Sequence, residues 1–98
     1  MPYFVVFATD KDGHANVRAE NREDHIAFLR GHDHPIKIAM GGPTMDDQSD
    51  GVSGSLLVLE AESLAQARAF CADDPYAKAG LFETTEVRPF NWGIKPPE

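Results

Sequence analysis

The spacing of apolar residues along the chain predicts four strands. Residues 3–8 are aromatic, β-branched or small, which indicates a buried strand. Residues 36–42 alternate larger apolar side chains with small or polar ones, as a half-buried strand does, and Pro43 is expected to end it. A third strand is predicted at 54–60 around four consecutive aliphatic residues, and a fourth from Leu81 to about Arg88.

Two helices are predicted between these strands. The first runs from about Arg22 to Arg30, with Asn21 as its N-cap and Gly31 as its stop. The second opens at the capping-box pattern Ser63-Leu64-Ala65-Gln66. It ends at Asp73-Asp74-Pro75, because the residue before a proline avoids the α region. One further helical turn is expected at 77–79, before Gly80.

The order strand, helix, strand, strand, helix, strand is typical of the split βαβ, or ferredoxin-like, α+β fold. Both helices would then cover one face of a four-stranded antiparallel sheet. The opposite face also carries apolar residues, and a second copy of the chain, packed sheet against sheet, would cover it. We therefore expect a homodimer.

Length and composition narrow the class of protein. Ninety-eight residues suffice for one domain, which we place at 1–90, followed by a tail at 91–98 that contains two prolines. The acidic stretch 44–51 is expected to be an exposed loop. The net charge is −7, and the nine Lys and Arg residues are scattered, which argues against nucleic acid and anionic membranes as partners.

The expected compartment is the cytoplasm. The longest apolar run, 3–8, is far too short to span a bilayer, and the N-terminus lacks the basic and apolar pattern of a secretory signal. Cys71 is the only cysteine, so it cannot form an internal disulfide. Its place in the second helix predicts a small core residue rather than a nucleophile.

A histidine in the first predicted helix is the first candidate for chemistry. His25, Phe28, Leu29 and His32 share one helix face. Phe28 and Leu29 should point into the core, which places His25 at the edge of the buried surface, where its ring nitrogens need partners. A backbone carbonyl could be that partner, in which case His25 would be structural.

The segment Asp74-Pro75-Tyr76 is the second candidate, although alone it is explained as a helix terminator. Taken together, the order and spacing of several such features resemble the YciI-like (YCII-related) family over roughly residues 3–90. The features are Arg22-x-x-His25-x-x-x-Leu29, Gly41-Gly42-Pro43, Gly54-Ser55, Asp74-Pro75-Tyr76 and Ala79-Gly80. The acidic loop at 44–51 and the tail after Phe90 depart from the family pattern.

The resemblance implies a YciI-like domain at 1–90, a ferredoxin-like subunit in a dimeric α+β barrel, and a cleft in which His25 and Asp74 meet. Within the family, cofactor-independent dehydrochlorinase-type activity on chlorinated hydroxyquinol-like compounds has been ascribed to such a pair. A carboxylate bound to one imidazole nitrogen fixes the tautomer and leaves the other nitrogen as a base.

The resulting hypothesis is a lyase- or isomerase-like enzyme, without a cofactor, that acts on a small oxygenated substrate. His25 and Asp74 would be catalytic. Arg22 would bind an anionic group, Ser55 would orient the substrate, and Tyr76 would supply a wall or a hydrogen bond. Each of these three also has a structural explanation: a helix surface charge, a strand hydroxyl and a packing aromatic.

Three alternatives remain. One is an interaction domain that recruits a partner through its barrel, which no feature of the sequence supports positively. The same pair could hold a ligand without turnover, which would make the protein a non-catalytic small-ligand-binding barrel. A metal site at His32-Asp33-His34 with His25 has suitable ligand types, but its spacing matches no established signature and the segment is predicted to be a turn. We therefore expect no metal. His14, beside Gly13 in a turn, has no evident role.

Overall fold

The computed structural model describes residues 2–31, 33–94 and 96. Seven elements follow one another along the chain: β1 (Tyr3–Asp10), α1 (Ala15–Arg30), β2 (Lys37–Met45), β3 (Val52–Glu60), α2 (Leu64–Asp73), the single-turn helix α3 (Pro75–Lys78) and β4 (Phe82–Phe90).

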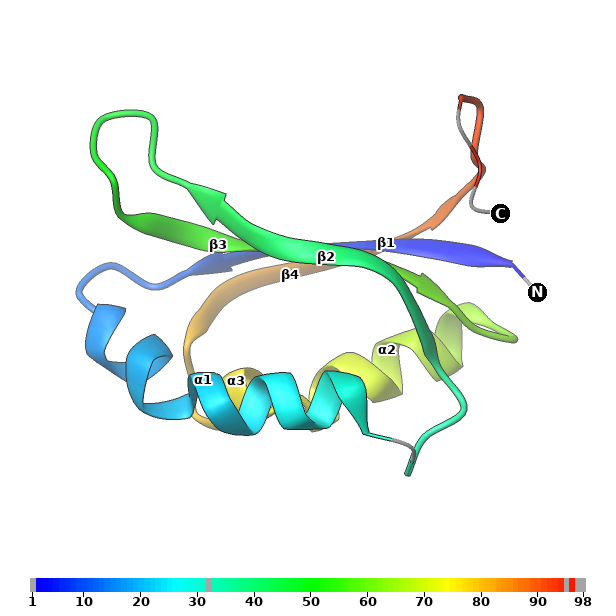
Figure 1. The fold of residues 1–98 in the computed structure, drawn as a ribbon, viewed down its shortest axis with the longest axis horizontal. Coiled ribbons are helices and arrows are strands. Elements are labelled where there is room, and N and C mark those ends of the chain that lie inside the picture. Colours follow the sequence, from blue (N-terminus) through cyan, green and yellow to red (C-terminus); the bar gives the residue numbers. More distant parts are fainter. Residues whose placement is uncertain (1, 32, 95, 97–98) are drawn as a thin grey trace.

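The four strands form one sheet in the order β2-β3-β1-β4, and every neighbouring pair is antiparallel. All three helices lie on the same side of this sheet, and the other side carries no helix (Figure 1). This is the ferredoxin-like α+β arrangement, so the predicted fold of the subunit is confirmed.

The core lies between the sheet and the helices. Its sheet side comes from alternate residues of the two central strands, among them Phe4 and Val6 of β1 and Leu57 and Leu59 of β3. Phe70 of α2 packs against them and stacks on Phe28 of α1, with 4.7 Å between the ring centroids. Burying each such side chain contributes about 1.5–3 kcal/mol, so this layer holds the helices on the sheet.

The first helix begins seven residues earlier than predicted, at Ala15 instead of Arg22. Asn21 is therefore not an N-cap: it lies inside α1, and its side-chain amide donates to the Val17 carbonyl oxygen one turn back. The prediction failed because residues 15–21 show no apolar stripe. Gly31 does end the helix, as predicted.

Two strands extend through a proline. The second strand was expected to end at Pro43, and the fourth was expected to end at about Arg88, just before Pro89. Pro43 lies within β2, opposite Ser55, and Pro89 lies within β4, opposite Phe4. Both strands are edges of the sheet, where a residue that lacks an N–H need not interrupt a ladder on its outer side. The loop predicted at 44–51 is accordingly shorter, because Thr44 and Met45 belong to β2 and Val52 to β3.

The second helix was predicted correctly at both ends. The Ser63 hydroxyl accepts from the Gln66 backbone N–H at 3.1 Å, and the Gln66 side chain accepts in return from the Glu62 N–H at 2.7 Å. α2 ends at Asp73, because Asp74 before Pro75 is extended. The short turn that follows spans 75–78 rather than the predicted 77–79.

The start of the C-terminal tail packs against the sheet. The Trp92 indole meets the Tyr3 ring edge-on at 5.8 Å and the Phe90 ring at 5.3 Å. Among the described residues, no helix is long and apolar enough to cross a membrane.

One glycine is required by the spacing of the two central strands. A Cβ on Gly54 would lie 2.0 Å from the Ala8 carbonyl oxygen, which is backbone and cannot move aside. We expect Gly54→Ala to lower the free energy of unfolding by roughly 1–3 kcal/mol, as overpacking does. Urea denaturation measures this. Gly93→Ala is the control, because its Cβ would meet nothing within 4 Å, and equal stability of the two variants would contradict the expectation.

Candidate active site

Asp74 is held at the joint between α2 and α3. It is the C-cap of α2 and the N-cap of α3, and its Oδ1 accepts from the Tyr76 backbone N–H at 2.9 Å. Pro75 fixes the first position of α3, where a missing N–H costs nothing. Gly80, with φ of +75°, closes the turn, and the Leu81 N–H then donates to the Tyr76 carbonyl. The Asp-Pro-Tyr segment therefore fixes the direction of this carboxylate.

The structure brings His25 of α1 to that carboxylate. Nδ1 of His25 lies 2.8 Å from Oδ1 and 2.9 Å from Oδ2 of Asp74. Both residues are buried, with 8% and 5% of their surface exposed. An ionised carboxylate only accepts hydrogen bonds, so the proton of a neutral ring sits on Nδ1. Nε2 then carries the lone pair, and it makes no hydrogen bond with any described residue.

Tyr76 fixes the plane of the histidine ring. The two rings stack at a centroid distance of 3.9 Å and an angle of 14°. Burial raises the pKa of the Tyr76 hydroxyl, although Arg18 and Arg22 act in the opposite direction. The phenol is therefore neutral at physiological pH. Tyr76 lines the cleft beside the histidine, and its backbone N–H also holds Asp74.

Arg18 is a second organising residue, and the sequence analysis missed it. Its guanidinium binds both carboxylate oxygens of Asp10, at 2.7 and 2.9 Å, and donates to the Ser55 hydroxyl at 2.9 Å. It also lies over the Tyr76 ring, 4.7 Å from the centroid. Burial alone would lower the pKa of Arg18, but the hydrogen bonds and attraction from Asp10 outweigh it and raise the pKa.

A helix that began at Ala15 would have revealed Arg18. Arg18, Arg22 and His25 follow at intervals of four and three residues, so they share one face of α1. Because the predicted helix began at Arg22, Arg18 lay outside it, and the shared face with Arg22 and His25 could not be recognised.

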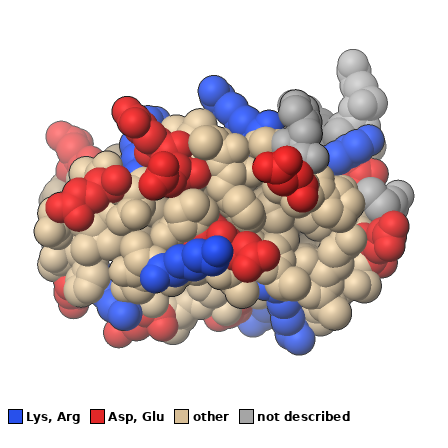
Figure 2. Space-filling view, turned by 90° about the horizontal axis from the view of Figure 1, so that it is seen from below, with Lys and Arg blue, Asp and Glu red and all other residues tan. Residues whose placement is uncertain are grey.

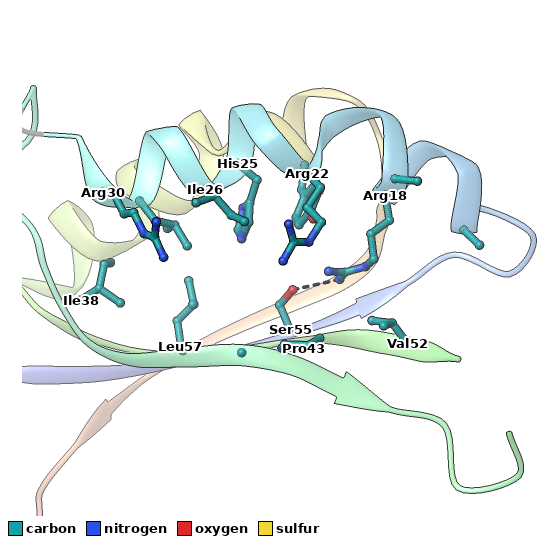
Figure 3. Close-up of a pocket in the computed structure, with 16 residues that line it drawn as sticks. Arg18, Arg22, His25, Ile26, Arg30, Ile38, Pro43, Val52, Ser55 and Leu57 are labelled. Carbon is teal, nitrogen blue, oxygen red and sulfur yellow. Dashed lines mark hydrogen bonds between the residues drawn. The ribbon is translucent and has the colours of Figure 1, made fainter. Parts of the chain in front are cut away.

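These side chains line a cleft of about 690 Å³ between α1 and the sheet (Figure 3). Its helix wall carries Arg18, Arg22, His25 and Arg30, all directed toward the sheet. Its sheet wall carries Ser55 and Leu57 of β3 and Ile38 of β2. Of the five residues singled out in the sequence, Arg22, His25, Ser55 and Tyr76 line the cleft, and Asp74 lies behind His25.

The charge of the cleft is opposite to that of the chain. Asp and Glu number sixteen against nine Lys and Arg, yet three arginines and no carboxylate are among the residues that line the cleft. On the outer face of the helices, by contrast, acidic and basic side chains are both present, and several lie next to one another (Figure 2). The cleft is therefore suited to a small anion.

The histidines near the end of α1 are placed differently. His34 is packed between Phe28 and Phe70, and its Nε2 hydrogen-bonds with the Phe28 carbonyl at 2.9 Å. His32 lies outside the described residues. Within the described part of the chain, no three His, Cys, Asp or Glu side chains gather as metal ligands would. His14 hydrogen-bonds through Nδ1 with the Asp12 carbonyl, away from the cleft.

Comparisons with known proteins agree on one family. Residues 2–91 match the YCII-related domain. The chain is 35% identical to Protein YciI of Escherichia coli over 92 residues, which cover 89% of this chain and 94% of the relative. A 32% identical protein of Haemophilus influenzae matches over 93 residues, 90% of this chain and 95% of that protein.

A solved structure is similar over almost the whole chain. It is 5-chloro-2-hydroxyhydroquinone dehydrochlorinase (TftG) of Burkholderia phenoliruptrix, in complex with 2,5-dihydroxybenzoquinone. The TM-score is 0.82 and the identity 35%, over 93% of this chain and 95% of that one. SnoaB, a cofactor-independent oxygenase of Streptomyces nogalater, shares the fold at a TM-score of 0.54, with 16% identity over 98% and 96% of the two chains.

The cysteine near the site is expected to be inert. Burial raises the pKa of the Cys71 thiol to about 11 from its ordinary 9.0, and Asp74 adds to the rise. At pH 8 this difference lowers the thiolate population about 100-fold. We expect iodoacetamide to modify the folded protein about 100-fold more slowly than the chain unfolded in guanidinium, as followed by mass spectrometry. Equal rates would contradict this.

The same pKa difference has a consequence for stability. The pKa of the Cys71 thiol is higher in the folded chain than in the unfolded chain. The contribution of this group to the free energy of unfolding is therefore present in full below about pH 9 and is lost as the pH rises toward 11. Cys71→Ala should therefore remove part of the loss of stability between pH 9 and 11.

Proposed function

The chain belongs to the YCII-related domain family, and on that basis and on the geometry of its cleft we propose that it is a cofactor-independent enzyme of the lyase or isomerase type. His25 transfers protons on a small oxygenated substrate, and Asp74 orients it. One observation carries the proposal: Nδ1 of His25 is bound to a buried carboxylate, and the same ring lines the cleft.

The base acts through Nε2. Asp74 accepts from Nδ1 and stabilises the positive charge that the ring gains when Nε2 takes a proton. General acid–base catalysis by a histidine positioned in this way typically contributes about 10²–10⁴-fold in rate. Stacking on Tyr76 keeps the ring from rotating, so Nε2 remains directed toward the substrate.

An elimination of HCl fits a single base of this kind. In a hydroxylated, chlorinated ring, moving a proton from a hydroxyl oxygen to the carbon that bears chlorine makes that carbon tetrahedral. A second hydroxyl proton is then lost while the C–Cl bond breaks and its electron pair leaves with chloride. The products are a quinone, a proton and chloride, so the step needs no external oxidant or reductant. The similar dehydrochlorinase supports this class of reaction for the present chain.

Three side chains would position the substrate. Arg22, one turn before His25, binds an oxyanion beside the base. Ser55, 5% exposed, presents its hydroxyl beside Arg18 and orients a substrate oxygen. Tyr76 limits the space on the far side of the imidazole. Arg18 positions Ser55 and Tyr76.

We also propose that two copies of the chain pair through the uncovered face of the sheet to form the dimeric barrel. Phe7 pairs with Leu56, and Met40 with Val58. Phe7, Leu56 and Val58 alternate along their strands with core residues that face the helices, so these pairs face the other side of the sheet. That side carries no helix (Figure 1). Phe7 is 48% and Met40 45% exposed in the single subunit. An apolar sheet face of this kind is stabilised when a second sheet covers it.

His25 provides the direct test of the catalytic proposal. With 5-chloro-2-hydroxyhydroquinone as the first substrate tried, we expect His25→Gln to lower kcat by about 10²–10⁴-fold, because the base is lost. Chloride release measures turnover, and thermal unfolding verifies that each variant is folded. Glu23→Gln, an exposed change on α1, is the control and should leave kcat unchanged.

Two outcomes would overturn this reading. Turnover that persists unchanged in His25→Gln would remove the histidine from the mechanism. Tight binding of 2,5-dihydroxybenzoquinone by a wild-type protein that turns over no chlorinated hydroxyquinol would instead identify a ligand-binding barrel.

The dimer is tested by mass in solution. Light scattering after size exclusion should give about twice the chain mass of 10.8 kDa. Phe7→Glu places a charge in the proposed interface and should yield monomers, since a buried unpaired charge is costly. Ala65→Glu puts the same charge on the exposed side of α2 and should remain dimeric. A monomeric wild-type protein would contradict the proposal.

A further inference from the structure

The three arginines of the cleft differ in what they bind. Arg18 is neutralised by the two oxygens of Asp10. Arg22 and Arg30 form no ion pair and no hydrogen bond with any described residue, although both line the cleft and point toward the sheet (Figure 3). Two unneutralised guanidinium groups therefore face one cavity in a chain with a net charge of −7.

The surroundings of Arg22 and Arg30 distinguish them from the arginines on other surfaces. Elsewhere Arg88 pairs with Glu86 at 2.8 Å, and Arg68 pairs with no described residue but does not line this cleft. The residues that line this cleft include no Asp or Glu. The charge of Arg22 and Arg30 is thus left for a ligand, and guanidinium prefers carboxylate or another oxyanion with two acceptor oxygens.

The two groups lie at opposite ends of an apolar floor. They are eight residues apart on α1, which places their backbones about 12 Å apart along the helix axis. Between them α1 presents Ile26 and Leu29, and the sheet presents Ile38 and Leu57 opposite. Arg22 shares its end with His25 and Ser55, whereas Arg30 lies at the apolar end, beyond the reacting centre.

We infer that the substrate is a hydroxylated ring or enol that carries a carboxylate on an apolar arm, with the carboxylate bound by Arg30. The oxygenated ring lies at Arg22, Ser55 and His25, and the arm crosses Leu57 and Ile38. This inference rests on the proposed function for the identity of the reacting end. It adds a second anion site, which selects substrates by length and by the presence of a terminal acid.

A series of phenolic acids tests the length requirement. 4-Hydroxybenzoate, 4-hydroxyphenylacetate and 3-(4-hydroxyphenyl)propanoate carry the carboxylate progressively farther from the phenol oxygen. Isothermal titration calorimetry at low salt should give tighter binding as the arm lengthens. The longest acid should bind at least about 10-fold more tightly than its methyl ester, since the ester cannot form the charge-assisted pair.

Arg30→Gln should abolish both the length dependence and the preference for acid over ester. It should change the affinity for the methyl ester, which carries no charge, by less than about twofold. Arg68→Gln is the matched control, because Arg68 lies on α2 beside a different groove. Arg30→Lys should keep part of the acid preference, since it retains the charge without the planar fork.

The inference fails if the ester binds as tightly as the acid, if Arg30→Gln leaves the preference intact, or if none of the acids binds at millimolar concentration. Failure of the catalytic proposal would look different. A protein that loses no activity in His25→Gln but shows the acid preference would retain the Arg30 site, because binding at Arg30 does not require the base.

Discussion

The hydrogen bond between His25 and Asp74 is the interaction on which the arrangement of both helical segments depends. It joins α1 to the α2–α3 joint across 49 positions of the sequence, at 2.8 Å and out of contact with most solvent. A carboxylate in such surroundings must be satisfied, because an unpaired buried charge costs several kcal/mol. Asp74 meets this requirement with the imidazole on one side and the Tyr76 N–H on the other. The group that orients the proposed base is therefore also part of the fold.

The face of α1 that is turned toward the sheet is partly polar because it covers a cleft rather than only the apolar core. Its C-terminal half packs Phe28 and Leu29 against the apolar layer, whereas its N-terminal half turns Arg18 and Arg22 toward the sheet. A helix normally gains most of its stability from an apolar face. Here the first two turns are held by Arg18, whose bonds to Asp10 and Ser55 connect α1 to β1 and β3. An ion pair thus replaces apolar packing where space is left for a ligand.

This division explains what sequence reasoning could and could not predict. The strands, the second helix and the packing of Phe28 and Leu29 against the core were predicted, because the spacing of apolar residues reports burial directly. The first seven residues of α1 were not predicted to be helical, because the face that they turn toward the sheet is polar. For the same reason Arg18 and its ion pair with Asp10 were not predicted. The strand ends predicted near Pro43 and Pro89 were wrong, because the sequence does not reveal which strands lie at the edge of the sheet, where a proline is tolerated. The meeting of His25 and Asp74 came from the family resemblance, since no local pattern connects residues so far apart. Arg30 was absent from the predicted site because an exposed arginine at a helix end resembles ordinary capping.

The placement of charge has a further consequence for specificity. A small anion approaching a protein with a net charge of −7 is repelled at long range, and salt screens this repulsion beyond about 8–10 Å. Within the cleft the balance reverses, because two arginines remain unneutralised and no carboxylate lines the wall. Attraction is therefore strongest for small anions that fit between α1 and the sheet, because Arg22 and Arg30 line this cleft although both are also exposed to solvent. A negative net charge on the chain and unneutralised arginines on the cleft wall together favour a small oxyanion that can enter the cleft beside His25 over a large polyanion that cannot.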